Sequence, residues 1–336
     1  MDKYILKRLE EADDETWDKF VDESPQGTIF NKSWYLKYQY KNYYINTVLD
    51  AGNKIIAGMV LGFHQKTNHI IFNKSLYDGI LFCDMSELKE NKKNTMEIEL
   101  STILIESIPK VGFYYSTFHY TFDNWVPFLW KGYDQYTKYS YVIDNSREID
   151  TVFDAFSGSA RRYIKQAAKS IRNISYEASV ENYQSEFYKQ LEEVYKHQNK
   201  NTPMSFNEFC MYDNMLKENN ARKVFFAYLD DKIISAVYVI YDNKSAYLVM
   251  SGNDNEYRSY NAQYLLTWEA IKYFNNAKIK YFDFEGSVMK NVEEHYRKYG
   301  GTYKPYYVIT KSNNILFDFI WYLRKRNRTK RLYAEE

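Results

Sequence analysis

The order of predicted strands and helices in residues 221–310 constrains the fold more than any other part of the sequence. Three runs of apolar and β-branched residues come first, and short turns containing Asp and Asn separate them. Such runs predict an antiparallel meander, and the 3.6-residue periodicity that follows predicts a helix. Because a strand, a short helix and a last strand complete the segment, we expect a mixed sheet covered by helices. The predicted strands are 223–229, 232–241, 244–251, 280–285 and 306–309, and the long helix is 260–275.

The first part of the chain repeats this plan in outline. The repeat lies in the architecture and not in the residues, and it indicates two domains of the same kind in one chain. We therefore expect an N-terminal domain at 1–145 and a C-terminal domain at 146–336. The predicted strands of the first part are 4–9, 44–50, 54–64, 69–72, 112–120 and 139–143, with helices at 33–40 and 94–108.

Composition excludes several classes of protein. The 336 residues suffice for about two domains. With 45 basic and 44 acidic residues the net charge is +1, so nothing predicts a DNA partner, for which a strongly basic domain is expected. The two cysteines and five histidines lack the spacing of a metal site, so we expect no metal. The sequence shows no signal peptide and no membrane span, and we expect a cytoplasmic protein.

The stretch 280–301, KYFDFEGSVMKNVEEHYRKYGG, carries the residues best suited to chemistry. By strand alternation Asp283 and Glu285 share one face, and two neighbouring carboxylates raise the pKa of one of them, as a general base requires. The alternative is an ion pair that holds the helix to the strand. Arg297 and Lys298 end the following helix, where they would bind phosphate or stabilise negative charge. A solvated helix end that complements the dipole is the other interpretation.

A second basic group lies on a predicted helix within 152–171. Four cations fall on one helical face at spacings of i, i+4, i+8 and i+11, and a fifth lies beside them. This face would bind a phosphate-rich acceptor, although charge runs of this kind also occur as solvated faces. The five residues are Arg161, Lys165, Lys169 and Arg172, with Arg162 beside them.

The C-terminal segment combines an amphipathic helix at 314–328 with a basic run at 324–331. A basic run next to an apolar helix face gains about 1 kcal/mol per Lys or Arg near an anionic membrane surface. The segment therefore predicts peripheral membrane contact, which would suit a lipid-linked substrate. A packed helix with a frayed tail is the alternative.

Taken together, these segments resemble the FemAB-like branch of the Gcn5-related N-acyltransferase (GNAT) superfamily, in its duplicated two-domain form. The resemblance covers most of the chain, and the order and spacing of its elements carry it. The matching elements are Trp17–Val21 with Gly27–Phe30 and Trp34, the helix ARRYIKQA at 160–167, and FDFEGS at 282–287 followed by YRKYGG at 296–301.

The resemblance implies an α/β fold, in which two tandem GNAT-like domains each contain a mixed sheet. It also implies a donor site in the sequence NEYRSYNA at 255–262, since the superfamily grips the pyrophosphate of CoA with backbone N–H groups at a helix start. Arg258 fits the family pattern, whereas Asn261 and Gln263 replace small residues. Arg258, Asn261 and Ala262 are the predicted cofactor-binding residues; an ordinary helix start is the alternative.

The activity that the resemblance implies is transfer of an acyl group to an amine. Glu285 or Asp283 would position or deprotonate the amine, and Arg297 would stabilise negative charge. On the acceptor side the predicted residues are Arg162, Lys165 and Lys298.

The resemblance leaves the donor open between acyl-CoA and aminoacyl-tRNA. The peptidoglycan members of the family carry a Lys where Tyr296 falls here, and a long coiled-coil insertion of some tRNA-using members is missing. We therefore expect an N-acyltransferase that uses acyl-CoA and a small-molecule or lipid-linked amine, such as an amino sugar or amino-acid group of a cell-envelope or polysaccharide precursor. The alternatives are an aminoacyl-tRNA-dependent transferase that builds peptidoglycan peptide bridges and a non-catalytic module that binds a glycolipid or a partner.

Overall fold

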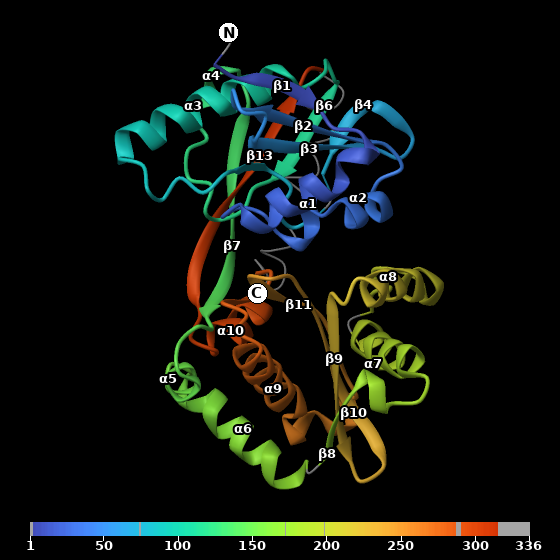
Figure 1. Cartoon of the computed structure of the whole chain (residues 1–336). Coiled ribbons are helices and arrows are strands. Elements are labelled where there is room, and N and C mark those ends of the chain that lie inside the picture. Colours follow the sequence, from blue (N-terminus) through green and yellow to red (C-terminus); the bar gives the residue numbers. More distant parts are fainter. Residues whose placement is uncertain (1–2, 74, 172, 198, 287–289, 315–336) are drawn as a thin grey trace. The chain divides into compact units, whose positions relative to one another are not determined.

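The computed structural model describes residues 3–73, 75–171, 173–197, 199–286 and 290–314 (Figure 1). The chain divides into two compact units: unit 1 holds residues 1–138 and the chain from Pro305 on, and unit 2 holds Tyr139–Lys304. The predicted helix at 314–328 with its basic run, Arg172 and Ser287 fall outside the described residues, apart from Asn314 itself. In the described part of the chain, no helix is long and apolar enough to cross a membrane.

Unit 1 is built on one mixed sheet. Its strand order is β1-β2-β3-β4-β6-β13, in which β4 and β6 run parallel. The short β5 pairs with β3 in antiparallel orientation, outside this order. The central β3 reads IIAGMVLGF and is buried throughout, as expected of a strand covered on both faces. The strands are β1 (Ile5–Arg8), β2 (Tyr43–Leu49), β3 (Ile55–His64), β4 (Thr67–Phe72), β5 (Ile80–Phe82), β6 (Phe113–Thr117) and β13 (Thr302–Ser312), and the helices are α1 (Asp14–Glu23), α2 (Ser33–Gln39), α3 (Glu90–Glu106) and α4 (Val126–Trp130).

Unit 2 repeats this arrangement. Its strand order is β7-β12-β11-β10-β9-β8, and β11 and β12 form its parallel pair. The strands are β7 (Asp134–Asp144), which begins in unit 1, β8 (Asn173–Tyr176), β9 (Arg222–Leu229), β10 (Lys232–Tyr241), β11 (Ser245–Asn253) and β12 (Tyr281–Asp283), and the helices are α5 (Ile149–Asp154), α6 (Gly158–Ser170), α7 (Tyr183–His197), α8 (Phe206–Glu218), α9 (Ala262–Asn276) and α10 (Lys290–Arg297).

Helices cover both faces of the unit 2 sheet (Figure 1). On one face, apolar residues of α6 and α9 pack with the sheet in one buried cluster that includes Ile164, Leu266 and Phe225. On the other face, α7 and α8 pack their aromatic rings on Tyr238, whose ring centroid lies 5.2 Å from Phe187 and 5.8 Å from Phe209. The sheet is therefore a rigid support for the segments at its ends.

The structure confirms the predicted fold class and the predicted order of elements after residue 221, from β9 to β13. The short strands β5 and β8 were not predicted. The compact units divide at residues 138 and 139, against the expected boundary at 145 and 146. The last strand also returns to unit 1, because Val308–Ser312 pair with Phe113–Thr117 of β6.

Candidate active site

The sheet of unit 2 opens where its two parallel strands part. β11 and β12 pair only from Ser245–Tyr281 to Tyr247–Asp283, after which β12 ends and β11 continues to Asn253. Among the described residues, no strand pairs with this edge of β11 beyond Tyr247. A register shift against β10 also leaves Val249 as an extra residue in β11. Bulges of this kind often lie next to active sites, because they re-aim the chain.

Asp283 fixes the end of β12. The residue is buried, and its Oδ1 accepts hydrogen bonds from the Ser140 hydroxyl on β7 and from the Glu285 backbone N–H, the latter at 2.8 Å. Two donors on one oxygen hold the carboxylate in place and turn the chain directly after the strand. Asp283 therefore acts on the geometry of Glu285.

The turn after β12 has a left-handed backbone at two successive residues. Glu285 has φ +56° and Gly286 has φ +68°. A Cβ at Gly286 would lie 1.8 Å from the carbonyl oxygen of Tyr139, so only glycine fits there. The strand thus ends at Asp283, and the expectation that Asp283 and Glu285 share one strand face is wrong. A left-handed non-glycine residue costs about 1–3 kcal/mol, and such residues cluster at functional sites.

Glu285 has the electrostatics of a proton acceptor. The residue is half-buried, and burial of its carboxyl group, with a smaller contribution from the charge of Asp283, raises its pKa to about 8. Tyr296 on α10 packs its ring 5.0 Å from that of Phe284, the residue before Glu285, and burial and then the charge of Glu285 raise the pKa of its hydroxyl. At neutral pH the carboxyl group of Glu285 therefore readily gains or loses a proton, whereas the hydroxyl of Tyr296 keeps its proton.

The cations at the end of α10 point to different neighbours. Arg297 is 61% exposed, and its Nε lies 3.3 Å from the Glu293 carboxylate. Lys298 is half-buried and its Nζ lies 3.5 Å from the Tyr264 hydroxyl, in the first turn of α9. Burial and the charge of Lys298 lower the pKa of His295 to about 4, so this imidazole is neutral. The structure thus brings Lys298, and not Arg297, to α9.

The start of α9 is open to an anion. It follows a short 3₁₀ turn, η4 (Asn255–Tyr260), through Asn261 at φ +58°, and the Asn261 side chain bonds to the Ser259 carbonyl at 3.1 Å and does not cap the helix. No acidic residue lies in the first turn. Free N–H groups and the helix dipole favour negative charge at such an end. Ala262 is buried at this start, and Arg258 is exposed on the preceding turn.

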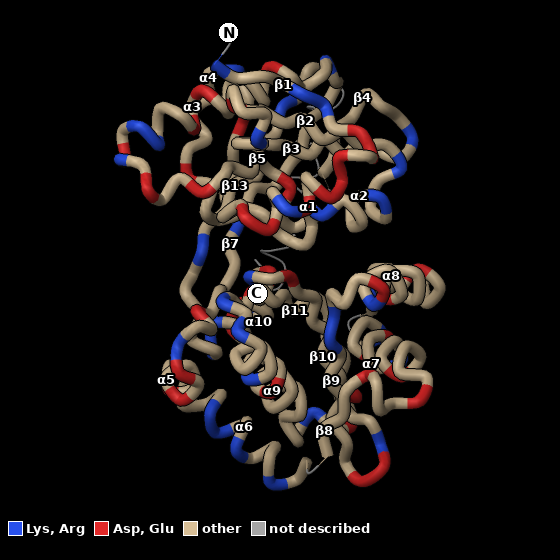
Figure 2. Tube along the Cα trace, in the orientation of Figure 1, with Lys and Arg blue, Asp and Glu red and all other residues tan. Residues whose placement is uncertain are grey.

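Helix α6 carries the predicted basic face along its exposed side (Figure 2). Ser157 caps the helix by accepting the Ala160 N–H at 3.2 Å, and α6 meets α9 where the Tyr163 and Tyr264 ring centroids are 5.1 Å apart. Arg161 is paired with Asp154 at 3.3 Å. The face lines a hollow of about 420 Å³, formed by Gly158, Arg161, Arg162, Lys165, Gln166 and Lys169.

The structure thus places the predicted residues in three groups. Asp283 and Glu285 form the turn after β12. Lys298 reaches the first turn of α9, which begins at Ala262, and Arg162 and Lys165 line the hollow on α6. From the sequence, Tyr296 was of interest only because the peptidoglycan members of the family carry a Lys at its position. Its role beside Glu285 follows from burial that the sequence pattern does not reveal.

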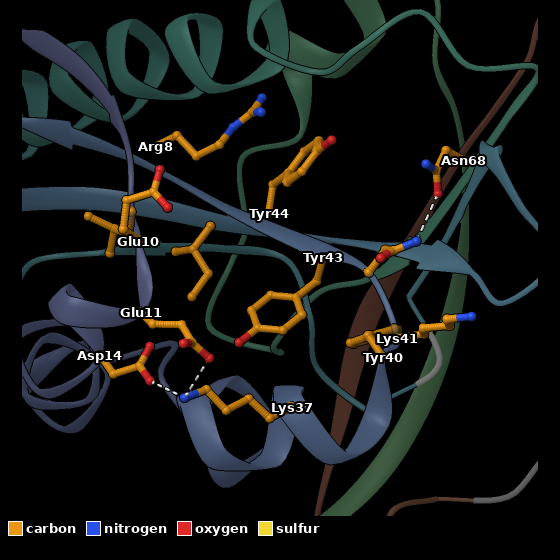
Figure 3. Close-up of a pocket in the computed structure, with 13 residues that line it drawn as sticks. Arg8, Glu10, Glu11, Asp14, Lys37, Tyr40, Lys41, Tyr43, Tyr44 and Asn68 are labelled. Carbon is orange, nitrogen blue, oxygen red and sulfur yellow. Dashed lines mark hydrogen bonds and ion pairs between the residues drawn. The ribbon is translucent and has the colours of Figure 1, made fainter.

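Unit 1 has a polar hollow of its own, about 590 Å³ in volume (Figure 3). Charges on its wall largely neutralise one another: Lys37 contacts Asp14 at 2.7 Å and Glu11 at 3.3 Å, and the Arg8 guanidinium lies 3.7 Å from the ring centre of Tyr44. In the part of the chain that the structure describes, no group of His, Cys, Asp and Glu side chains is placed to hold a metal ion.

Residues 155–298 match the family model of the acetyltransferase (GNAT) domain. No curated protein sequence matches the chain. Among solved structures, FemX is similar at TM-score 0.67 and 11% identity, covering 90% of this chain and 96% of its own. L-PGS from Bacillus licheniformis is similar at 0.54 and 11%, covering 94% and 97%. A tandem GNAT protein from the clavulanic acid biosynthesis pathway is similar at 0.53 and 9%, covering 93% and 99%. At these identities the structural likenesses establish the fold.

Proposed function

We propose, from the premise that residues 155–298 belong to the acetyltransferase (GNAT) family, that this acyltransferase moves an acyl group from acyl-CoA to an amine. The observation that carries the proposal is the parting of β11 and β12 beside Glu285. There an open strand edge, a carboxyl group with a raised pKa and a protonated tyrosine occur together. Acyl transfer needs a place for the carbonyl, a base for the amine and an acid for the leaving group.

The start of α9 suits the phosphates of the donor. Its first N–H groups have no side-chain cap, and Asn261 supplies the left-handed turn that small residues supply in the family pattern. Ala262 lets the donor approach the backbone, and Arg258 on η4 would pair with a phosphate.

The side chains of the turn and of α10 would carry the proton transfers. Glu285 takes the proton of the amine as its nitrogen attacks the thioester carbon, and the new C–N bond forms as the C–S bond breaks. Tyr296 donates its proton to the departing thiolate. Asp283 holds Glu285 in place through its backbone N–H. Lys298 stabilises the negative charge that develops, because its Nζ reaches the first turn of α9, and Arg297 beside Glu293 is left for the acceptor.

The acceptor that we propose is an amino sugar or an amino-acid group of a cell-envelope or polysaccharide precursor. Arg162 and Lys165 would bind its phosphate at the hollow on α6. Similarity to the C-terminal domain of a putative lysylphosphatidylglycerol synthetase from Agrobacterium fabrum supports an envelope substrate. The proposed membrane contact rests on the segment beyond residue 314. Vesicle sedimentation of the full chain and of a chain ending at Leu323 tests that contact, and equal binding by both contradicts it.

A second candidate donor is aminoacyl-tRNA. The basic hollow along α6 favours it, since a phosphate backbone binds to such a surface, and the similarity to FemX also supports it. In that case the chain would be a FemAB-type transferase for peptidoglycan peptide bridges. Binding of tRNA would then weaken steeply as salt is raised, because counterions are released when Lys and Arg contact phosphates.

A thermal-shift titration separates the two donors. A ligand that binds only the folded protein raises the unfolding midpoint, so acetyl-CoA and longer acyl-CoAs should raise it and charged tRNA should not. A shift with charged tRNA alone contradicts the proposal and favours the second candidate. No shift with either donor favours a non-catalytic binding module. Transfer from radiolabelled acetyl-CoA to glucosamine then tests the chemistry.

A further inference from the structure

Three tyrosines of unit 2 form an aromatic surface that is exposed at Tyr303 and half-buried at Tyr139 and Tyr141, and no step of the proposed acyl transfer uses these rings. The rings of Tyr139 on β7 and Tyr303 on β13 are stacked, with centroids 4.4 Å apart and planes inclined by 11°. Tyr141 lies 5.3 Å from Tyr303. Tyr303 stays 50% exposed, so part of its ring is open to a ligand.

Hydrogen-bonding groups of both kinds lie at the rim of this surface. The Tyr141 hydroxyl donates to Glu293 Oε1 at 2.6 Å, and the same oxygen lies 3.3 Å from Arg297 Nε. Burial and Glu293 raise the pKa of Tyr141 to about 12, so its hydroxyl keeps the proton that it donates. Among the described residues Arg297 pairs with Glu293 through Nε, which leaves its terminal nitrogens for a ligand, and the side chain is 61% exposed. The rim thus offers a carboxylate that accepts and a guanidinium that donates.

The surface adjoins the turn that holds Glu285. Phe284 donates its N–H to the Tyr141 carbonyl at 3.0 Å, and Gly286 touches the Tyr139 carbonyl so closely that no Cβ fits. The backbone of Tyr139 and Tyr141 therefore supports the turn, while their rings form the surface. A ligand on these rings would lie beside the turn that presents Glu285.

We propose that Tyr139, Tyr141 and Tyr303 bind a sugar ring of the acceptor, with its hydroxyls on Glu293 and Arg297. The proposal rests on the proposed function, since it assigns the amine to a sugar-bearing molecule. A pyranose has an apolar C–H face for the exposed ring and hydroxyls that both donate and accept. Glu293 accepts from such a hydroxyl and Arg297 donates to one. An alkyl chain has no hydroxyl to offer to either rim group.

Saturation-transfer NMR on the full-length protein tests this site with glucosamine and with ethanolamine, an amine that lacks the ring. We expect Tyr303→Leu to weaken glucosamine binding at least tenfold and to leave ethanolamine unchanged. Leucine retains apolar bulk but lacks the flat ring. The matched control is Tyr176→Leu, at an exposed tyrosine of β8 that packs on Phe225, and it should bind glucosamine as the unmodified protein does.

Two results overturn the proposal: equal glucosamine binding by the Tyr303→Leu and Tyr176→Leu variants, or Tyr303-dependent binding of adenosine without binding of glucosamine. The second result assigns the rings to a nucleobase, which aromatic side chains also stack. Acetyl transfer to both amines without Tyr303-dependent sugar binding leaves the proposed function intact and removes this inference. Tyr303-dependent sugar binding without transfer from any acyl donor supports this inference and contradicts the proposed function.

Discussion

The two units share one plan but differ at the parallel strand pair. In unit 2, β11 and β12 part after three residue pairs and the edge of β11 stays open. In unit 1, β4 and β6 also pair over three positions, but the chain beyond β4 folds back over the opening. There the buried Asn73 amide donates to the Val60 carbonyl at 3.1 Å and to Ser116 Oγ at 3.0 Å. The same plan thus gives an open edge in one unit and a filled one in the other.

The helices after these strands differ in the same sense. In unit 1, α3 begins with Glu90 in its first turn, whereas the first turn of α9 in unit 2 has no acidic residue. Negative charge at a helix start offsets the dipole and repels phosphate. This difference indicates that the shared fold is not sufficient for a donor-binding site. An open strand edge and an uncharged helix start must occur together, and they do so in unit 2.

Each unit also holds a carboxyl group with a raised pKa. Burial raises the pKa of Asp78 in unit 1 to about 7, and that of Glu285 in unit 2 to about 8. Asp78 has no exposed surface, and its Oδ2 accepts the Ser75 N–H at 2.8 Å and the Tyr40 hydroxyl at 3.4 Å. Glu285 is half-buried, so it is less enclosed than Asp78. Because no substrate can reach the buried carboxyl group of Asp78, its raised pKa does not make it a catalytic base, and we interpret Asp78 as a structural residue.

The largest expected effect separates these two carboxyl groups. Glu285→Gln should lower kcat about 10²- to 10⁴-fold, the usual contribution of a positioned general base. Asp78→Asn should leave kcat unchanged, because no substrate reaches it. Steady-state acetyl transfer by both variants measures the difference. Equal activities would remove Glu285 from the mechanism and the contrast between the units with it.

Two glycines with left-handed backbones provide the next comparison. Gly286→Ala should cost about 3 kcal/mol or more and abolish turnover, because its Cβ meets a backbone oxygen. Gly132 in unit 1 also has a left-handed backbone, with φ +73°, but a Cβ added there would have no atom closer than 4.0 Å. Gly132→Ala should therefore cost only the backbone strain of about 1 kcal/mol. Urea unfolding of both variants measures these costs. A small cost at Gly286 would show that the turn can shift.

A single negative charge at each helix start tests the donor site. Asn261→Asp should weaken acetyl-CoA binding about tenfold, because the charge opposes the phosphates and lies at the dipole that holds them. Asn91→Asp adds the same charge near the start of α3, where we expect no change in binding. Calorimetric titration of both variants provides the two affinities. Equal losses would point to the net charge and not to the site on α9.

The last comparison is a pH dependence of stability that both carboxyl groups share. Folding raises the pKa of Asp78 from the usual value of 3.8 to about 7 and that of Glu285 from 4.5 to about 8. Between these values the folded protein keeps a proton that the unfolded chain releases. Stability should therefore fall as pH rises through these windows and level off above pH 8.

Urea midpoints between pH 4 and pH 9 measure this fall. Asp78→Asn should remove the part of the decline that ends near pH 7, and Glu285→Gln the part that ends near pH 8. Since each amide mimics the protonated acid, a variant that keeps the full decline would contradict the assignment of its group.

The order of strands and helices was predictable because each is set by local residues. Apolar and β-branched runs located β3, β9 and β10 within a few residues, and the cation spacing predicted the basic face of α6. The short β5 and β8 were missed, since three or four residues show no reliable period and each is fixed by its partner strand.

The geometry of the site was less predictable, because distant contacts decide it. Strand alternation carried the prediction past Asp283 to Glu285, but the bond from the Glu285 N–H to Asp283 turns the chain there. Ser140, the other donor to Asp283, lies 143 residues away in sequence. The left-handed Asn261 was within reach of sequence reasoning, since asparagine tolerates that conformation.

Hydrogen exchange with and without acetyl-CoA tests the central claim most directly, because it reports on both units in one experiment. Ligand binding should slow exchange at residues 248–253 on the edge of β11 and at 255–265 around the start of α9. The corresponding segment of unit 1, residues 75–94, should exchange at the same rate in both samples. Protection of the unit 1 segment alone, or of neither segment at saturating acetyl-CoA, would contradict a donor site in unit 2.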